Sequence, residues 1–202
     1  MSIQPLHFVE TLPPEEVARA NFYGLLARLF YGPPDASLLK TIAAAGDIDA
    51  EDAGISGAWR ALVRAAGAAD AEAARDEYDT AFVGTGKSPV TLYAGAYLIR
   101  FSSEAPLAQL RGELNALGLE RRAGAHEPED HIAALCDVMR YLIAVQKRDL
   151  FEQRRFFERW IGPVVEPLCD AIEREPATAF YKAVGQFAKA FLALERSAFE
   201  ML

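Results

Sequence analysis

The residues best equipped for chemistry lie in the stretch "AHEPEDHI", which contains Glu127, Glu129, Asp130 and His131. Carboxylates beside an imidazole can act as acid and base, bind a metal ion or bind an organic cation. The same stretch also suits the beginning of a helix, because Pro128 fits a first helical turn and acidic side chains are favoured at the positive end of a helix dipole. That structural interpretation leaves His131 unexplained, since a protonated imidazole is disfavoured at this end of a helix.

A metal site or a catalytic dyad is poorly supported. The chain has only three histidines, His7, His126 and His131, and it lacks Cys-x-x-Cys and His-Glu-x-x-His spacing. Adjacent helical residues point about 100° apart, so Asp130 and His131 would not orient each other. No serine or cysteine lies in a recognisable nucleophile turn. We therefore expect no metal, no cofactor and no catalytic residue.

Binding of a cation beside an apolar surface is the better functional interpretation. Carboxylates pair well with guanidinium groups. The stripe that begins at Ile132 and reaches Ile143 could lie alongside an apolar ligand segment. In such a site His131 could tune the charge near neutral pH, or it could form a hydrogen bond that fixes the beginning of the helix.

The stretch "GTGKS" is the one glycine-rich loop in the chain. A Walker loop has four residues between its first glycine and its Gly-Lys-Ser/Thr end, whereas only Thr85 separates Gly84 from Gly86 here. No convincing strand precedes the loop. A nucleotide-hydrolysing enzyme is therefore disfavoured, and hydrolysis that is lost on changing Lys87 would revive it.

Composition indicates a soluble, well-packed protein of one large or two small domains, with 51% hydrophobic and 25% charged residues among 202. Acidic residues outnumber basic ones by 29 to 21, for a net charge of −8. This balance disfavours nucleic acid as a partner, because nucleic-acid binding depends on clustered Lys and Arg. A cationic partner fits the surface better.

The cellular compartment is expected to be the cytoplasm. Cys136 and Cys169 lie in apolar, helix-like sequence without the spacing of a disulfide framework, so we expect small buried thiols in a reducing environment. The first residues, "MSIQPLHFVE", lack the pattern of a secretory signal peptide, and no run of 18 apolar residues occurs, so we expect no membrane insertion.

Helical periodicity runs through most of the chain. Helices are expected over 15–31, 35–45, 56–66, 69–82, 104–118, 132–143, 151–160, 163–175 and 176–197. No alternating, strand-like segment is found, so the predicted fold class is all-α, a single helical domain of about ten helices. The polar connection "GLERRAGAHEPED" suggests a hinge over about 119–129, between an N-terminal half (about 1–118) and a C-terminal half (about 130–202).

The combination of these segments resembles the TorD/DmsD family of cytoplasmic redox-enzyme maturation chaperones. "EPEDHI" resembles the Glu-Pro-x-Asp-His motif that opens a helix in the C-terminal half of that family. The resemblance extends over roughly residues 16–196, through "FYGLLARLFYGPPD", "YDTAFVGTGKSPVTLYAGAYL", "FFERWIGPVV" and "AFYKAVGQFAKAFL".

The resemblance implies an all-helical chaperone without catalytic turnover. Such a protein binds the twin-arginine signal peptide, and in some cases the body, of a molybdopterin-containing oxidoreductase until its cofactor is inserted. The family's peptide-binding residues correspond to Asp130, His131, Tyr78 and Phe82. Glu127 and Glu129 are expected to help Asp130 to bind the arginines.

Some of these residues have a second interpretation or depart from the family pattern. An aromatic pair at i and i+4, such as Tyr78 and Phe82, is usually part of a core. Tyr78 also stands where relatives often have tryptophan, Ala81 where leucine is common, and Gly95 where serine is often found, which leaves the client oxidoreductase open.

The main alternative function is a helical scaffold that assembles a multisubunit redox complex without recognising a signal peptide. The sequence is compatible with a monomer or with a homodimer, which could form by exchange of C-terminal halves at the hinge.

Overall fold

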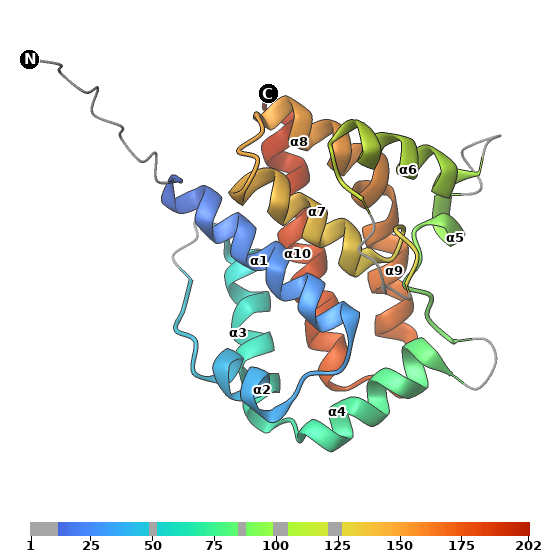
Figure 1. Cartoon of the computed structure of the whole chain (residues 1–202). Coiled ribbons are helices and arrows are strands. Elements are labelled where there is room, and N and C mark those ends of the chain that lie inside the picture. The colour runs from blue at the N-terminus through green and yellow to red at the C-terminus, as the bar shows by residue number, and fades with distance from the viewer. Residues whose placement is uncertain (1–11, 49–51, 85–87, 99–104, 121–126) are drawn as a thin grey trace, which may run out of the picture.

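The computed structural model describes residues 12–48, 52–84, 88–98, 105–120 and 127–202, and these residues form helices and connecting loops without a strand. The fold is all-α, as predicted. The helices are α1 (Pro14–Tyr31), α2 (Ala36–Ala43), α3 (Ala53–Ala68), α4 (Ala71–Tyr78), α5 (Gly95–Leu98), α6 (Pro106–Ala116), α7 (Ile132–Ala144), α8 (Leu150–Phe156), α9 (Gly162–Arg174) and α10 (Phe180–Glu200) (Figure 1).

Local capping explains several of the helix beginnings. Asp35 caps α2 by accepting a hydrogen bond from the Leu38 backbone N–H at 2.8 Å, as its position predicted. Asp52 and Asp70 cap α3 and α4 in the same way. Short polar side chains satisfy backbone N–H groups that have no partner within the helix. These boundaries therefore follow from nearby sequence.

Two predicted helices continue into a π-helical turn. The helix expected over 69–82 consists of α4 followed by the turn Asp79–Val83, and α8 is followed by the turn Phe157–Ile161. The short helix α5 was not predicted, α3 begins at Ala53 rather than at Ser56, and α10 begins at Phe180 rather than at Pro176.

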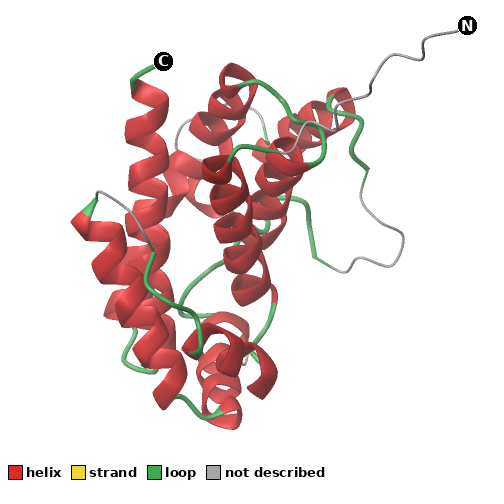
Figure 2. Ribbon diagram, turned by 90° about the vertical axis from the view of Figure 1, so that its left-hand side faces the viewer, coloured by secondary structure: helices red, strands yellow, loops and turns green. Residues whose placement is uncertain are grey.

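The core joins the first part of the chain to the last. Helix α1 packs along α7, and α10 packs against both α3 and α9. Figures 1 and 2 show α10 running through the body of the protein, with α3 beside it. Between these helices lies an aromatic cluster in which Phe22 contacts Trp59, Phe187 and Phe191.

A buried ion pair also joins α1 to α10. The Arg19 guanidinium donates to both carboxylate oxygens of Glu195, at 2.7 and 2.8 Å. The Tyr23 hydroxyl donates to the same carboxylate at 3.0 Å. Buried charges are tolerated when they are paired and hydrogen-bonded in this way.

The thiols of Cys136 and Cys169 are free and buried, as expected. None of the helices in the described part of the chain is long and apolar enough to cross a membrane. Residues 85–87 of the "GTGKS" stretch, residues 121–126 of the expected hinge and residues 1–11 lie outside the described residues.

Candidate functional site

Residues 128–130 are not helical, although Pro128 and the acidic side chains suit a first helical turn. Helix α7 begins at Ile132, as the expected range of 132–143 gave it. A segment from another part of the chain pairs with the backbone before the helix. The Ala94 N–H donates to the Asp130 carbonyl, and the Ile132 N–H donates to the Leu92 carbonyl, both at 2.8 Å. This short antiparallel pairing holds the residues in front of α7 in a non-helical conformation, so tertiary contacts override the local helix signal.

His131 is the N-cap residue of α7. Its Nδ1 accepts a hydrogen bond from the Ala133 N–H at 3.2 Å, and the residue is only 4% exposed. Burial lowers the pKa of His131, against the opposing effect of the Glu127 and Asp130 carboxylates. A ring nitrogen that accepts a hydrogen bond carries no proton, so burial and capping both favour the neutral imidazole. Of the two roles considered for His131, the structure shows the hydrogen bond at the beginning of this helix.

Asp130 uses its carboxylate inside the protein. The residue is 8% exposed, and its Oδ2 accepts a hydrogen bond from the Gly95 N–H, the first residue of α5, at 3.0 Å. A Cβ at position 95 would lie 2.8 Å from this oxygen, so glycine leaves the room that the carboxylate occupies. Asp130 thus fixes the segment before α5 against the beginning of α7.

The two glutamates of the stretch lie nearer to solvent and have different partners. The Tyr93 hydroxyl donates to Glu127, and this hydrogen bond, together with burial, raises the pKa of Tyr93 to about 12. Arg111 of α6 donates to both oxygens of Glu129, at 3.1 and 3.0 Å. Both carboxylates therefore accept hydrogen bonds from side chains of other segments.

Tyr78 and Phe82 lie in the core. Their rings contact each other and the Tyr181 ring, with centroids 5.0–5.7 Å apart. The Tyr78 hydroxyl donates to the Phe30 carbonyl at 3.0 Å. Burial raises the pKa of Tyr78 to about 12, and the charge of Glu127 adds to the rise. Both rings pack as core residues in this conformation.

A groove of about 620 Å³ lies beside the "EPEDHI" stretch, bounded by α1, the end of α6 and α7. We call it the α1–α7 groove. Its apolar lining consists of Ala27, Leu114, Leu119, Ala134 and Val138, among others. Its carboxylates are Glu120, Glu127, Glu129 and Asp137. Glu127, Glu129 and His131 are thus brought together along it, whereas Asp130, Tyr78 and Phe82 do not line it.

Sequence reasoning missed the groove residues outside the "EPEDHI" stretch. Tyr31, at the end of α1, is 66% exposed and lines the groove, as does Asp137 in α7. For Asp137 a signal was present, because α7 carries a second stripe at helical spacing opposite its buried face. This stripe consists of Ala134, Asp137, Val138 and Tyr141.

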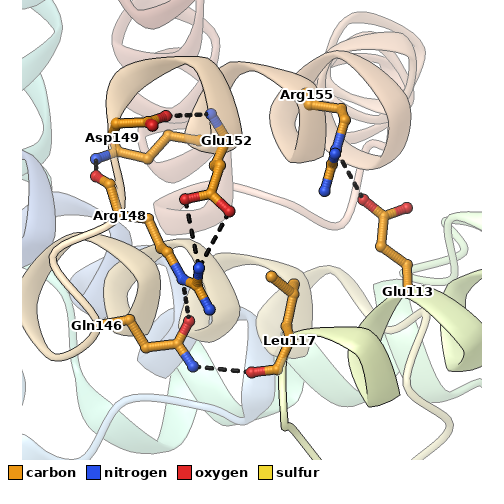
Figure 3. Close-up of polar contacts among 8 residues, drawn as sticks. Glu113, Leu117, Gln146, Arg148, Asp149, Glu152 and Arg155 are labelled. Carbon is orange, nitrogen blue, oxygen red and sulfur yellow. Dashed lines mark hydrogen bonds and ion pairs between the residues drawn. The ribbon is translucent and has the colours of Figure 1, made fainter.

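Polar contacts hold α6 at the edge of the groove. The Gln146 side chain donates to the Leu117 carbonyl at 2.8 Å, and Arg148 donates to Gln146 at 2.9 Å (Figure 3). One turn earlier, within α6, Glu113 accepts a hydrogen bond from the Trp160 indole at 2.8 Å. These contacts join α6 and the residue after it to Gln146 and Trp160, and they hold the α6 edge of the groove in place.

The fold and the groove define the class of protein: an all-α protein with an apolar groove edged by carboxylates. Comparison with protein families agrees with this class. Residues 48–170 match the family described as nitrate reductase delta subunit. Because the match covers more than half of the chain, the protein belongs to this family.

Membership confirms the resemblance to the TorD/DmsD chaperones and supports a chaperone role in molybdoenzyme maturation. The family is consistent with a protein that is not an enzyme. No curated protein matches the sequence significantly.

Proposed function

We propose that this protein is a cytoplasmic chaperone that binds the twin-arginine signal peptide of a molybdopterin-containing oxidoreductase precursor. It holds the precursor until the cofactor has been inserted and then releases it for export or assembly. The observation that carries this proposal is the α1–α7 groove, where four carboxylates edge an apolar lining. An arginine-bearing, apolar leader matches both properties.

The carboxylates and the apolar side chains of the groove are complementary to such a peptide, although Arg28 also lines it. A guanidinium and a carboxylate can form two parallel hydrogen bonds, which orient the peptide. Burial of the peptide's apolar stretch supplies affinity at roughly 25 cal/mol per Å², before the cost of ordering a flexible chain. Affinity of micromolar order would then allow release of the client.

We assign direct contact with the arginines to Glu127, Glu129 and Asp137. All three line the groove, and the Asp137 side chain is 60% exposed and accepts a hydrogen bond from Arg140 at 2.7 Å. Asp130 was expected as the first arginine partner, but its burial and its hydrogen bond to Gly95 favour a positioning role. His131 likewise positions the beginning of α7 through its hydrogen bond with the Ala133 N–H.

Tyr78 and Phe82 are proposed to support the groove from beneath. Both rings are buried, and the Tyr78 hydroxyl donates to the carbonyl of Phe30, the neighbour of Tyr31, which lines the groove. In this role they hold the end of α1 in place, and they contact the peptide only through a rearrangement of the core.

Isothermal titration tests the proposal with two synthetic peptides, one with paired arginines before an apolar stretch and one with paired lysines. We expect the Arg-Arg peptide to bind more tightly, because lysine cannot form the two-pronged pair. Asp137→Asn should weaken binding of the Arg-Arg peptide by roughly three- to tenfold, as expected for loss of one charge-assisted contact. Asp149→Asn removes a charge at the beginning of α8, outside the groove residues, and serves as the control.

No binding, or equal binding of the two peptides, would favour the alternative function of a helical assembly scaffold that does not recognise a signal peptide. Affinity capture from the native host, with mass spectrometry of the proteins retained, would then identify the assembly. Retention of a molybdoenzyme precursor would identify the client of the chaperone.

A further inference from the structure

Arg111 and Glu129 form the contact that a client arginine would need to make. The Arg111 Nε lies 3.1 Å from one carboxylate oxygen of Glu129, and its Nη2 lies 3.0 Å from the other. This is the two-pronged guanidinium–carboxylate geometry. Glu129 lines the α1–α7 groove, and its side chain is 13% exposed, whereas that of Arg111 is 50% exposed.

This ion pair is not the main attachment of α6. Leu110 and Leu114 bury their side chains in the core. Glu113 accepts the Trp160 indole hydrogen, and the Leu117 carbonyl accepts from Gln146. An ion pair with a half-exposed arginine adds little to such an attachment, because exposed pairs contribute little net stability. The pair can therefore open without loss of the helix.

We propose that Arg111 is an internal competitor in the groove: a guanidinium that occupies Glu129 until the arginine of a client peptide replaces it. This inference rests on the proposed function. Replacement exchanges one two-pronged pair for another, so it favours a ligand that can reproduce both hydrogen bonds. A lysine, with a single compact ammonium, would displace Arg111 at a net loss of hydrogen bonds.

The competition also lowers the affinity of the groove for its client. Part of the binding free energy is used to open the internal pair. Removal of Arg111 should therefore tighten binding of the Arg-Arg peptide by roughly two- to fivefold, the range that corresponds to the stability of an exposed ion pair. Binding of the Lys-Lys peptide should tighten by a similar factor, because the same internal pair must open for either peptide, so the preference for arginine should stay equal.

The test is a double-mutant cycle with isothermal titration of the Arg-Arg and Lys-Lys peptides. The variants are Arg111→Gln, Glu129→Gln and the double variant. Arg154→Gln is the matched control. It also removes one positive charge, from an arginine of α8 that pairs with Glu158 at 2.7 Å. Thermal unfolding of each variant verifies that the fold is retained.

We expect Arg111→Gln to tighten binding of the Arg-Arg peptide, Glu129→Gln to weaken it, and Arg111→Gln to have no effect when Glu129 is already changed. An equal gain in the Glu129→Gln background, or an equal gain from Arg154→Gln, would mean that the removed charge acts at long range and would overturn the inference. Unchanged affinity of Arg111→Gln for a peptide that binds the wild type overturns this inference alone. Absence of peptide binding to every variant overturns both it and the proposed function.

Discussion

The carboxylate of Asp130 and the imidazole of His131 both accept hydrogen bonds from backbone N–H groups, although their stretch was expected to bind an external cation. Each side chain fixes the backbone of a different segment, one before α5 and one at the beginning of α7. Glu127 and Glu129, from the same stretch, remain at the groove. One five-residue motif thus supplies both the scaffold and the charges of the proposed site.

The capping role of His131 predicts a pH dependence of stability. Because its folded-state pKa is lowered, the unfolded state binds more protons between that pKa and the unfolded value of about 6.5. The contribution of the neutral ring is therefore fully present above about pH 6.5 and decreases as the pH falls through this window. Urea unfolding at a series of pH values measures it.

His131→Asn is the matched variant, because asparagine is a good N-cap residue and does not titrate. We expect the free energy of unfolding of the variant to fall less than that of the wild type on acidification. If the difference in unfolding free energy between the two proteins is the same at every pH, the pKa of His131 is the same in the folded and unfolded states.

Among the helices, α10 obtains its N-terminal cap from a distant part of the chain. It has no side-chain cap of its own. The Glu77 carboxylate of α4 accepts hydrogen bonds from the N–H groups of Ala179, Phe180 and Tyr181, at 2.9, 3.0 and 3.2 Å. A carboxylate is favoured at the positive end of a helix, so Glu77 both caps α10 and holds α4 against it.

Glu77→Ala is therefore expected to lower the free energy of unfolding by about 1–2 kcal/mol, the range for loss of a helix cap. Asp76→Ala, at the exposed neighbouring position in α4, should change it by less than about 0.5 kcal/mol. Chemical denaturation monitored by circular dichroism measures both. Equal losses in the two variants would refute a capping role for Glu77.

Across the whole molecule, the first and last helices are joined by the buried Arg19–Glu195 pair. The Glu195 side chain is 4% exposed, and it also accepts the hydrogen bond of Tyr23. Helix α1 forms one wall of the groove. The position of that wall therefore depends on contacts with a helix near the other end of the sequence.

Glu195→Ala leaves the charge of Arg19 partly buried and should cost about 3–5 kcal/mol of stability. Glu16→Ala removes the other carboxylate that contacts Arg19, at 2.7 Å, and should cost less than about 1 kcal/mol because this pair is nearer to solvent. Urea unfolding compares the two. If Glu16→Ala is as destabilising as Glu195→Ala, burial of the α10 carboxylate is not the source of the stability.

Much of the fold could be read from local sequence. The spacing of apolar residues predicted the helices, and Asp35 was recognised as a cap, because periodicity and capping depend on residues within one or two turns of each other. The negative charge of the "EPEDHI" stretch, and its place directly before an apolar helix, were likewise evident.

Only the tertiary structure decided which of these charges face the groove. Gly95 meets Asp130, Arg111 meets Glu129 and Glu77 meets α10 through contacts between residues far apart in the chain. No local pattern encodes such contacts, because they depend on how helices pack around the common core. The sequence by itself determined the helices and the acidic stretch, and packing determined that Asp130 and His131 are buried while the two glutamates remain at the groove.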